Sequence, residues 1–202
     1  MALTMAKRLF DLIGASAALL LLAPLLLLVA LAIRLDSPGP VFFRQERVGR
    51  GGVPFRIHKF RTMRVDAPAL GPQVTVGQDA RITRVGHWLR DRRIDELPQF
   101  IDVLLGRMSL VGPRPEVPRF VAHYPVALAA QVLAVRPGIT DPASLAHIDE
   151  ASLLAGSADP ERTYIDQILP HKLALQAQYA ASATLWSDLA VLGRTLRVLL
   201  AR

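Results

Sequence analysis

Cysteine is absent from this chain of 202 residues, and aromatic residues make up only 6% of it. Without cysteine there is no disulfide framework, no thiolate nucleophile and no cysteine-ligated metal site, and the composition suits a reducing compartment. The small number of aromatic rings argues against a nucleic-acid surface, because such surfaces commonly stack bases on aromatic side chains. The sequence also shows no internal repeat, and the leucine run is its one low-complexity tract.

The charge and the hydropathy of the chain indicate two unlike parts. The net charge is +7 although 51% of the residues are apolar, and the mean hydropathy is +0.31. Half of the basic residues, 12 of 24, lie between Arg44 and Arg93, where only four acidic residues occur. A basic body suits nucleic acid, anionic lipid headgroups or a phosphorylated substrate. We therefore expect a membrane anchor, residues 1–36, joined to a basic domain, residues 37–202.

The anchor is predicted from residues 12–33, a run of 22 residues without a charge. A straight helix of that length is about 33 Å long, enough to cross the hydrocarbon core. A signal peptide does not fit, because the run is too long and no small-residue cleavage site follows it. Two features oppose a spanning helix. Pro24 removes a hydrogen bond in mid-run, and basic residues flank both ends, which draws both to the cytoplasmic side. A spanning helix and a kinked re-entrant helix both remain open.

A rigid turn, Ser37-Pro38-Gly39-Pro40, is predicted to end the anchor, and a β-hairpin is predicted to follow it. The strands would be residues 41–43 and 55–60, joined by a basic, glycine-rich segment at residues 47–52. Basic and apolar side chains alternate in the second strand, so one of its faces is basic. A glycine-rich basic loop is a weak phosphate motif on its own, and a solvated hairpin face explains the same pattern.

Two adjacent arginines followed by two adjacent carboxylates form the centre of the sequence pattern, at residues 92–96. Asp95 is predicted to be the N-cap of a short helix in which apolar residues recur at helical spacing until Gly106. Asp95 and Glu96 would then lie where backbone N–H groups and the helix dipole favour negative charge. Such a position can bind a phosphate, or a carboxylate that handles one. A capped helix with an Arg–Asp surface pair is the simpler interpretation of these residues alone.

Two further arginines stand beside prolines, Arg114 in Pro113-Arg114-Pro115 and Arg136 before Pro137. A guanidinium in a stiff segment suits bidentate recognition of phosphate, although a tight turn with an exposed arginine fits as well. Elsewhere we predict a loop over 67–77, helices over 79–93 and 120–135, a helix capped by Asp159 and interrupted at Pro170, and an amphipathic helix over 185–199. The last would pack as core or lie in a membrane interface.

Together these motifs resemble the bacterial sugar transferases, the small monotopic phosphoglycosyl transferases that start lipid-linked glycan synthesis. The resemblance covers about residues 5–140. It rests on several independent motifs in order: residues 7–11, the apolar run with Pro24, residues 37–43, 59–63, 95–99, 106–115 and 136–140. Because so many separate motifs occur in the same order along the chain, the resemblance is highly specific.

The resemblance implies a reaction, in which a sugar-1-phosphate passes from a UDP-sugar to undecaprenyl phosphate and UMP is released. Asp95 would attack the phosphate attached to the sugar and form a covalent intermediate. Glu96, with Asp95, would help to hold Mg²⁺, whose remaining ligands would be substrate oxygens and water. The cations implied to neutralise phosphate are Lys59, Arg61 and Arg114, with Arg136 and Arg93 as weaker candidates.

The resemblance also implies a location and an architecture. The N-terminal helix would be re-entrant and broken near Pro24, so that the chain sits in one leaflet on the cytoplasmic face of the bacterial inner membrane. The fold class would be α-rich α+β, with a re-entrant helix, interfacial amphipathic helices and a small β-hairpin beside the active site. The expected partners are undecaprenyl phosphate, a UDP-sugar, membrane lipids and downstream glycosyltransferases, without nucleic acid.

Two positions depart from the family pattern. Family members often carry Ser-Pro at the break, whereas this chain has Ala23-Pro24 and lacks the hydroxyl that could bond a freed carbonyl. Many members have Gly-Trp after the threonine at position 140, whereas this chain continues with Asp141-Pro142-Ala143. This second departure is similar to a subset of the family whose C-terminal third differs, and it does not identify the sugar.

Other functions fit parts of the pattern. A metal-dependent phosphohydrolase or an ordinary glycosyltransferase could also use acids and arginines, but the first needs no lipid acceptor and the second releases UDP. A basic, membrane-anchored scaffold that binds anionic lipid would explain the charge and the amphipathic helix. It would not explain two arginines held by prolines together with an acid pair.

Overall fold

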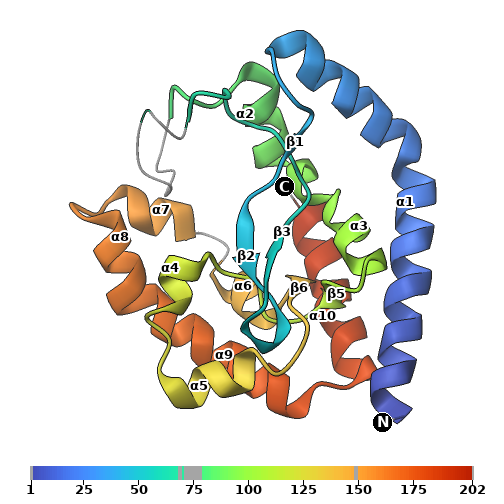
Figure 1. Ribbon diagram of the computed structural model, residues 1–202, viewed down its shortest axis with the longest axis vertical. Coiled ribbons are helices and arrows are strands. Elements are labelled where there is room, and N and C mark those ends of the chain that lie inside the picture. The colour runs from blue at the N-terminus through green and yellow to red at the C-terminus, as the bar shows by residue number, and fades with distance from the viewer. Residues whose placement is uncertain (1, 68–69, 71–78, 148–149, 202) are drawn as a thin grey trace.

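The computed structural model describes residues 2–67, 70, 79–147 and 150–201. A long helix, α1 (Ala2–Asp36), runs along one side of a body built from shorter helices and very short strands (Figure 1). The body contains, in chain order, β1 (Phe42–Phe43), β2 (Glu46–Val48), β3 (Pro54–Arg56), β4 (Lys59–Phe60), α2 (Arg84–Asp91), α3 (Gln99–Leu104), β5 (Ser109–Val111), α4 (Pro118–Val121), α5 (Val126–Val132), β6 (Gly138–Thr140), α6 (Pro142–Ala146), α7 (Glu150–Ala155), α8 (Pro160–Thr163), α9 (Leu169–Ser182) and α10 (Leu185–Leu200). The predicted helix-rich fold with small sheets is confirmed.

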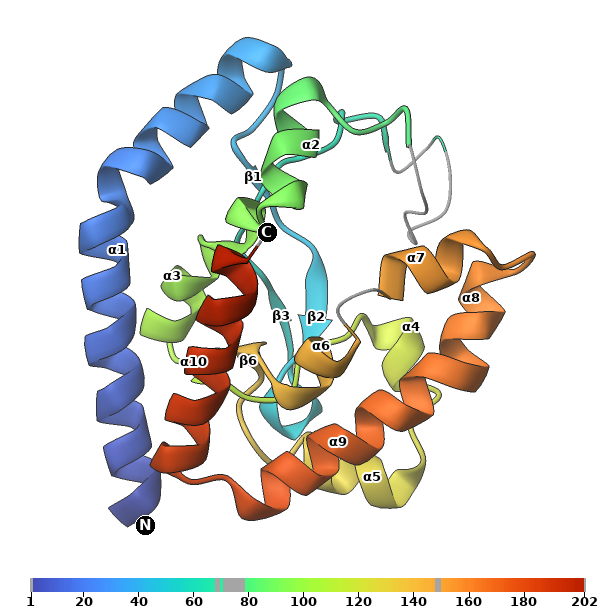
Figure 2. The same cartoon turned by 180° about the vertical axis from the view of Figure 1, so that it is seen from behind.

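α1 is the one helix in the described part of the chain that is long and apolar enough to cross a membrane. Only 11% of its most apolar window is buried inside the molecule, so it is not a core helix. It continues through Pro24 without interruption, and it bends along its length (Figures 1 and 2). The structure therefore has one continuous, bent helix where the family resemblance implied a break near Pro24. The re-entrant course through a membrane stays a prediction.

Charged side chains fix the first turns of α1 to the body. Lys7 Nζ lies 2.5 Å from Asp188 Oδ2 in α10. Arg8 donates to two backbone carbonyl oxygens at the end of α3. Asp11 is buried and accepts hydrogen bonds from the Ser109 hydroxyl and from a backbone N–H in β5. The basic residues before the apolar run therefore attach the anchor to the body, a role that the sequence pattern alone did not indicate.

The predicted β-hairpin is confirmed as two short antiparallel ladders, β1 with β4 and β2 with β3. The glycine-rich segment between β2 and β3 forms a tight turn, Arg50–Gly52. In this turn Gly51 and Gly52 have φ angles of 70° and 77°, which glycine adopts at little cost. At the other end of the hairpin, β4 lies against the turn that carries the acid pair. The hairpin therefore brings Lys59 to that turn.

Two predicted helices have different limits in the structure. The helix predicted over 79–93 begins only at Arg84, because the Thr83 side chain caps it by accepting a hydrogen bond from Gly86 N. The helix predicted over 120–135 is divided into α4 and α5, with Pro125 immediately before α5. Proline has no backbone N–H, so it favours a new helix start at this position. The loop predicted over 67–77 lies mostly outside the described residues.

The C-terminal helices follow the sequence pattern more closely. Asp159 is the N-cap of α8, as predicted, and accepts a hydrogen bond from Arg162 N. Pro170 does not break the helical path, because it lies in the first turn of α9 after a π-helical turn, Tyr164–Ile168. α10 is the predicted amphipathic helix and begins with a capping box at Thr184. It lies beside the first half of α1 (Figure 2).

A parallel pair of strands, β5 with β6, lies at the centre of the body. Two glycines permit the close approach of these segments, since a Cβ on Gly138 would lie 2.0 Å from Gly112 N. The segment that carries Arg114 follows β5, and the segment that carries Arg136 precedes β6. Three-residue strands carry little periodicity, so the sequence did not predict this pairing.

Candidate active site

The acid pair lies in a 3-10 turn, Ile94–Glu96, and not at a helix N-cap as the sequence predicted. Arg93, just before it, has φ 53° and ψ 22°, and it is the only non-glycine residue with a positive φ among the described residues. This left-handed conformation costs about 1 kcal/mol and commonly follows a helix end. It reverses the chain, so that α3 starts only at Gln99. The N-cap prediction was wrong because no glycine marks the reversal.

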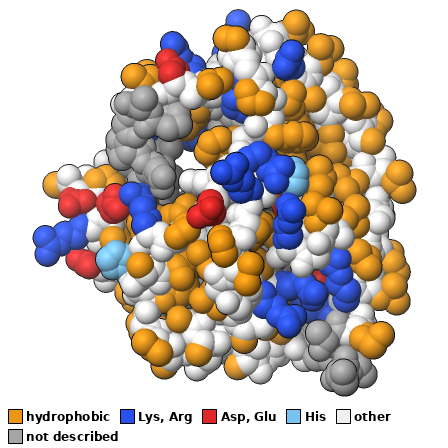
Figure 3. All heavy atoms as spheres, viewed as in Figure 1, with side chains coloured by type: hydrophobic (Ala, Val, Ile, Leu, Met, Phe, Trp, Pro, Cys, Tyr) orange, Lys and Arg blue, Asp and Glu red, His pale blue; other side chains and the backbone are white. Residues whose placement is uncertain are grey.

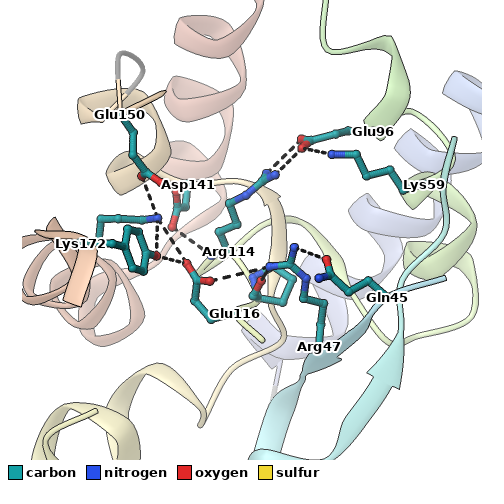
Figure 4. A network of polar contacts seen from close by, with 11 residues as sticks. Gln45, Arg47, Lys59, Glu96, Arg114, Glu116, Asp141, Glu150 and Lys172 are labelled. Atoms are coloured by element: carbon teal, nitrogen blue, oxygen red, sulfur yellow. Dashed lines mark hydrogen bonds and ion pairs between the residues drawn. The ribbon is translucent and has the colours of Figure 1, made fainter. Parts of the chain in front are cut away.

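Two cations from distant parts of the chain meet the acid pair, and Figure 4 shows both of them at Glu96. Lys59 Nζ lies 2.8 Å from Asp95 Oδ2 and 3.4 Å from Glu96 Oε1. Arg114 binds both oxygens of Glu96, with Nη1 3.0 Å from Oε2 and Nη2 hydrogen-bonded to Oε1. Asp95 itself is only 3% exposed. The structure thus gathers four residues from three separate sequence motifs into one charged cluster.

The charges in this cluster fix the protonation states of Glu96 and Arg114. Burial alone would raise the pKa of Glu96, but the positive charges of Arg114 and Lys59 outweigh it and hold that pKa well below its ordinary range. The Glu96 charge in turn raises the pKa of Arg114 despite burial. Glu96 is therefore a carboxylate and Arg114 a cation at any physiological pH.

Arg114 is supported from behind by Asp141. The backbone N–H of Arg114 donates to Asp141 Oδ2 at 3.0 Å, and Gln176 Nε2 donates to the same oxygen at 2.8 Å. The other oxygen of Asp141 accepts from Ser144 N at 2.6 Å and caps α6. Asp141 belongs to the segment that departs from the family pattern, so this departure supplies the support of the Arg114 loop.

The other predicted phosphate-binding arginines lie in different surroundings. Arg61 is 5% exposed, and its guanidinium donates to the carbonyl oxygens of Ser37 and Pro38 just after α1. Arg136 Nε donates to the carbonyl oxygen of Gly106 at 2.9 Å. Within the described residues neither arginine forms an ion pair with Asp95 or Glu96, so their role at the acid pair stays a prediction. Arg93 lines the same cavity as Glu96 and Arg114.

A second ion network, which no sequence motif indicated, lies behind Arg114 (Figure 4). Glu116 is buried and accepts a hydrogen bond from the Tyr164 hydroxyl. Lys172 Nζ lies 3.3 Å from Glu116 Oε1, and Arg47 Nη1 lies 3.8 Å from Oε2. Burial would raise the pKa of Glu116, but the charges of Lys172 and Arg47 lower it. No local pattern reveals this network, because its members are far apart in sequence.

The network makes a prediction about acid stability. A carboxyl whose pKa is lowered by folding stabilises the protein above its unfolded pKa, about 4.3 for Glu. That contribution is lost as the pH falls through the folded pKa. We expect Glu116→Gln to lower the stability at pH 7 by about 3 kcal/mol, because it leaves Arg47 without its acidic partner and Lys172 with Glu150 alone. Thermal unfolding in detergent from pH 3 to 7 should therefore show a flatter acid limb for this variant.

Glu161→Gln is the matched control, because the side chain of Glu161 in α8 is 42% exposed and, among the residues that the structure describes, pairs with Arg119 alone. This control should keep the wild-type stability and its acid limb. A Glu116→Gln variant that loses stability on acidification as steeply as the wild type would contradict the assignment of the acid limb to Glu116.

A cavity of 350 Å³ opens from the charged cluster towards α1 and α10. Its polar end is formed by Arg93, Glu96 and Arg114. Its walls are mostly aliphatic and come from α1, α3, β5, β6, α6 and α10 and from the residue after the 3-10 turn. The apolar wall residues are Ala18, Leu22, Leu97, Phe100, Leu110, Ile139, Leu145, Leu192, Leu196, Val198 and Leu199, with the polar groups of Thr140, Ser144 and Thr195 between them. A cavity with cations at one end and hydrocarbon walls suits an amphiphile with an anionic headgroup.

The acid pair fits Mg²⁺ only as an ion that the protein shares with a substrate. Among the described residues no group of three or more His, Asp or Glu side chains could hold a metal ion by itself. Asp95 and Glu96 offer two adjacent carboxylates, which also face Lys59 and Arg114. Mg²⁺ is commonly bound by one or two carboxylates plus substrate phosphates and water, and this donor set meets that requirement.

Comparisons with known proteins agree with the sequence motifs. The family model described as "Bacterial sugar transferase" matches residues 2–202. The chain is 40% identical over 198 residues to the UDP-N-acetylgalactosamine-undecaprenyl-phosphate N-acetylgalactosaminephosphotransferase of Aeromonas hydrophila, with 96% of this chain and 43% of that protein covered. It is 43% identical over 204 residues to the UDP-glucose:undecaprenyl-phosphate glucose-1-phosphate transferase of Caulobacter vibrioides, with 98% and 71% covered. The chain thus spans less than half the length of the Aeromonas relative.

Proposed function

Because the chain belongs to the bacterial sugar transferase family, we propose that it transfers a sugar-1-phosphate from a UDP-sugar to undecaprenyl phosphate and releases UMP. The observation that carries this proposal is the charged cluster of Lys59, Asp95, Glu96 and Arg114, of which Glu96 and Arg114 line a cavity with aliphatic walls. Names of the relatives give undecaprenyl phosphate as acceptor, with N-acetylgalactosamine or glucose as the sugar.

The proposed mechanism has two displacements at one phosphorus atom. An oxygen of the Asp95 carboxylate attacks the phosphorus that carries the sugar. The bond from this phosphorus to the bridging oxygen breaks, and UMP leaves with the electron pair. A phosphate oxygen of undecaprenyl phosphate then attacks the same phosphorus, and the bond to Asp95 breaks. The carboxylate is regenerated, and the sugar leaves as part of undecaprenyl-diphospho-sugar.

The neighbouring cations would position the reacting groups. Lys59, 2.8 Å from Asp95 Oδ2, fixes the orientation of the nucleophile and neutralises charge beside it. Arg114 presents a planar fork at the cavity mouth and would bind phosphate oxygens of the substrate. Asp95 and Glu96 would hold Mg²⁺ together with substrate oxygens, and a bound Mg²⁺ would neutralise the charge of the diphosphate.

We also propose that α1 anchors the chain in one leaflet of the bacterial inner membrane, from the cytoplasmic face. Its outer side chains support this, because Leu20, Leu21 and Leu27 are 77%, 80% and 72% exposed. The cavity lies between α1 and α10, so a prenyl chain could enter it from the bilayer. The lipid-linked product would then remain at the membrane for downstream glycosyltransferases.

Nucleotide release tests the reaction class. The purified chain in detergent would receive Mg²⁺, undecaprenyl phosphate and a panel of UDP-sugars, and UMP and UDP would be separated. We expect UMP whose formation depends on the lipid and on one sugar. Release of UDP would indicate glycosyl transfer and remove Asp95 as a phosphoryl carrier. Release of neither nucleotide by folded protein would favour a lipid-binding scaffold.

The aliphatic wall of α10 offers a further prediction. Leu196 lines the cavity, and 60% of its surface is exposed. A larger side chain at this position would therefore fill the cavity without overpacking the core. We expect Leu196→Trp to raise the KM for undecaprenyl phosphate about tenfold, equivalent to about 1.4 kcal/mol of lost binding, and to leave the KM for the UDP-sugar unchanged. Leu189→Trp, on α10 but outside the cavity, is the control. Equal effects of both substitutions would contradict the assignment of the cavity to the lipid.

A further inference from the structure

Two arginines from distant parts of the chain converge on the end of α3. Arg136 Nε donates to the carbonyl oxygen of Gly106 at 2.9 Å. Arg8 Nη1 and Nη2 donate to the carbonyl oxygens of Val103 and Leu104 at 2.8 and 3.1 Å. A Cβ on Gly106 would lie 3.5 Å from Arg8 Nη2, so both guanidinium groups flank this glycine. Their positive charges suit the C-terminal end of a helix.

Two more arginines extend this group. Arg107 directly follows Gly106 and is exposed. Arg50 lies in the turn between β2 and β3, which is held by a hydrogen bond of 2.7 Å from Gly51 N to the carbonyl oxygen of Leu133, three residues before Arg136. We call Arg8, Arg50, Arg107 and Arg136 the arginine cluster. Figure 3 shows a patch of Lys and Arg side chains on this face, next to the N-terminal half of α1.

The arginine cluster has little negative charge to balance it. Within the described residues its one ion pair joins Arg107 Nη1 to Asp102 Oδ1 at 3.7 Å, and this oxygen is also 2.8 Å from His58 Nδ1. Burial and the positive charges of Arg8 and Arg50 lower the pKa of Arg136, although the buried Asp11 opposes this. Each guanidinium has five N–H donors, and the backbone carbonyls take only some of them. Like charges with unused donors favour the binding of an anion.

The position of the cluster on α1 indicates which anion. Arg8 lies where the exposed apolar surface of α1 begins, between Met5 and Leu9 and one turn before Ile13, which are 75%, 60% and 61% exposed. A basic residue at such a boundary lies at the depth of the lipid headgroups when the apolar side chains enter the bilayer. We propose that the arginine cluster binds the phosphate of an anionic phospholipid headgroup, at a site separate from the acid pair. This inference shares with the proposed function only the membrane location of α1.

Native mass spectrometry of the full chain tests this site. The protein would be kept in detergent micelles that contain equal amounts of phosphatidylglycerol and phosphatidylcholine, and the retained lipids of each kind would be counted. We expect the wild type to retain phosphatidylglycerol preferentially. Arg50→Gln and Arg107→Gln should each lower this preference about fivefold, which corresponds to about 1 kcal/mol for each basic side chain near a headgroup. These two were chosen because Arg8 and Arg136 also hold backbone carbonyls.

The matched control is Arg162→Gln in α8, where an exposed arginine with the same charge lies far from α1 (Figure 1). It should leave the preference unchanged. An equal fall for Arg162→Gln, or a wild type that retains both lipids alike, would overturn the proposal. A parallel sample would contain millimolar inorganic phosphate. Retention that survives this addition supports a lipid site, whereas displacement of the lipid would assign the cluster to free phosphate and overturn the lipid site.

Discussion

Asp95→Asn is expected to reduce UMP release by about 10⁴-fold or more, because loss of a covalent nucleophile removes the reaction path and not only part of the binding energy. The amide is nearly isosteric with the carboxylate, so Lys59, 2.8 Å away, should remain in place. The measurement is UMP release with undecaprenyl phosphate and the preferred UDP-sugar. A second readout is covalent label: with sugar-phosphate-labelled donor and no acceptor lipid, the wild type should carry label and the variant should not.

The control for this substitution is Asp91→Asn. Asp91 ends α2 only four residues away, but it is exposed and forms no ion pair within the described part of the chain. It should retain wild-type turnover and wild-type labelling. Turnover by clean Asp95→Asn protein at the wild-type rate would exclude Asp95 as the nucleophile. An Asp95→Asn variant that loses turnover but still carries covalent label would show that another side chain is the nucleophile.

The amphipathic and capped elements could be predicted from the sequence because their determinants are local. The cap at Asp159, the helix α10 and the hairpin with its glycine turn each depend on residues within one short segment. The parallel pairing of β5 and β6 depends instead on the contact between Gly112 and Gly138, which lie 26 positions apart (138 minus 112). Three-residue strands offer too little periodicity to reveal such a partner.

In the candidate site, too, local features could be predicted from the sequence and long-range contacts could not. Asp95, Glu96, Lys59 and Arg114 stand in recognisable motifs, so they could be named from the sequence. Their shared location depends on the left-handed residue Arg93, which nothing in the sequence marks, because non-glycine residues seldom adopt this conformation.

The structure places the predicted cations in different surroundings. Lys59 and Arg114 contact the acid pair, whereas Arg61 and Arg136 each donate to backbone carbonyls. A sequence shows that a guanidinium is present, and only the fold shows which acceptors use its donors.

Arg114→Lys should lower kcat/KM for UMP release by about 10²- to 10³-fold, although it keeps the positive charge. Arg114 binds both oxygens of Glu96 through one planar fork, and a lysine ammonium cannot reproduce two parallel hydrogen bonds. The backbone N–H of Arg114 would still bond to Asp141, because that contact does not involve the side chain. The fold of the loop should therefore persist, and thermal unfolding should show a change that is small beside the loss of activity.

Arg119→Lys is the control. Arg119 lies in α4, does not line the cavity, and pairs with Glu161 at 3.1 Å. It should keep kcat/KM near the wild-type value. If only kcat of Arg114→Lys falls, the Arg114 guanidinium stabilises charge that develops during the displacement. If only KM rises, the guanidinium contributes to ground-state binding of the diphosphate. Activity of Arg114→Lys within threefold of the wild type would show that a point charge suffices at this position, and the bidentate geometry would then serve only to hold Glu96.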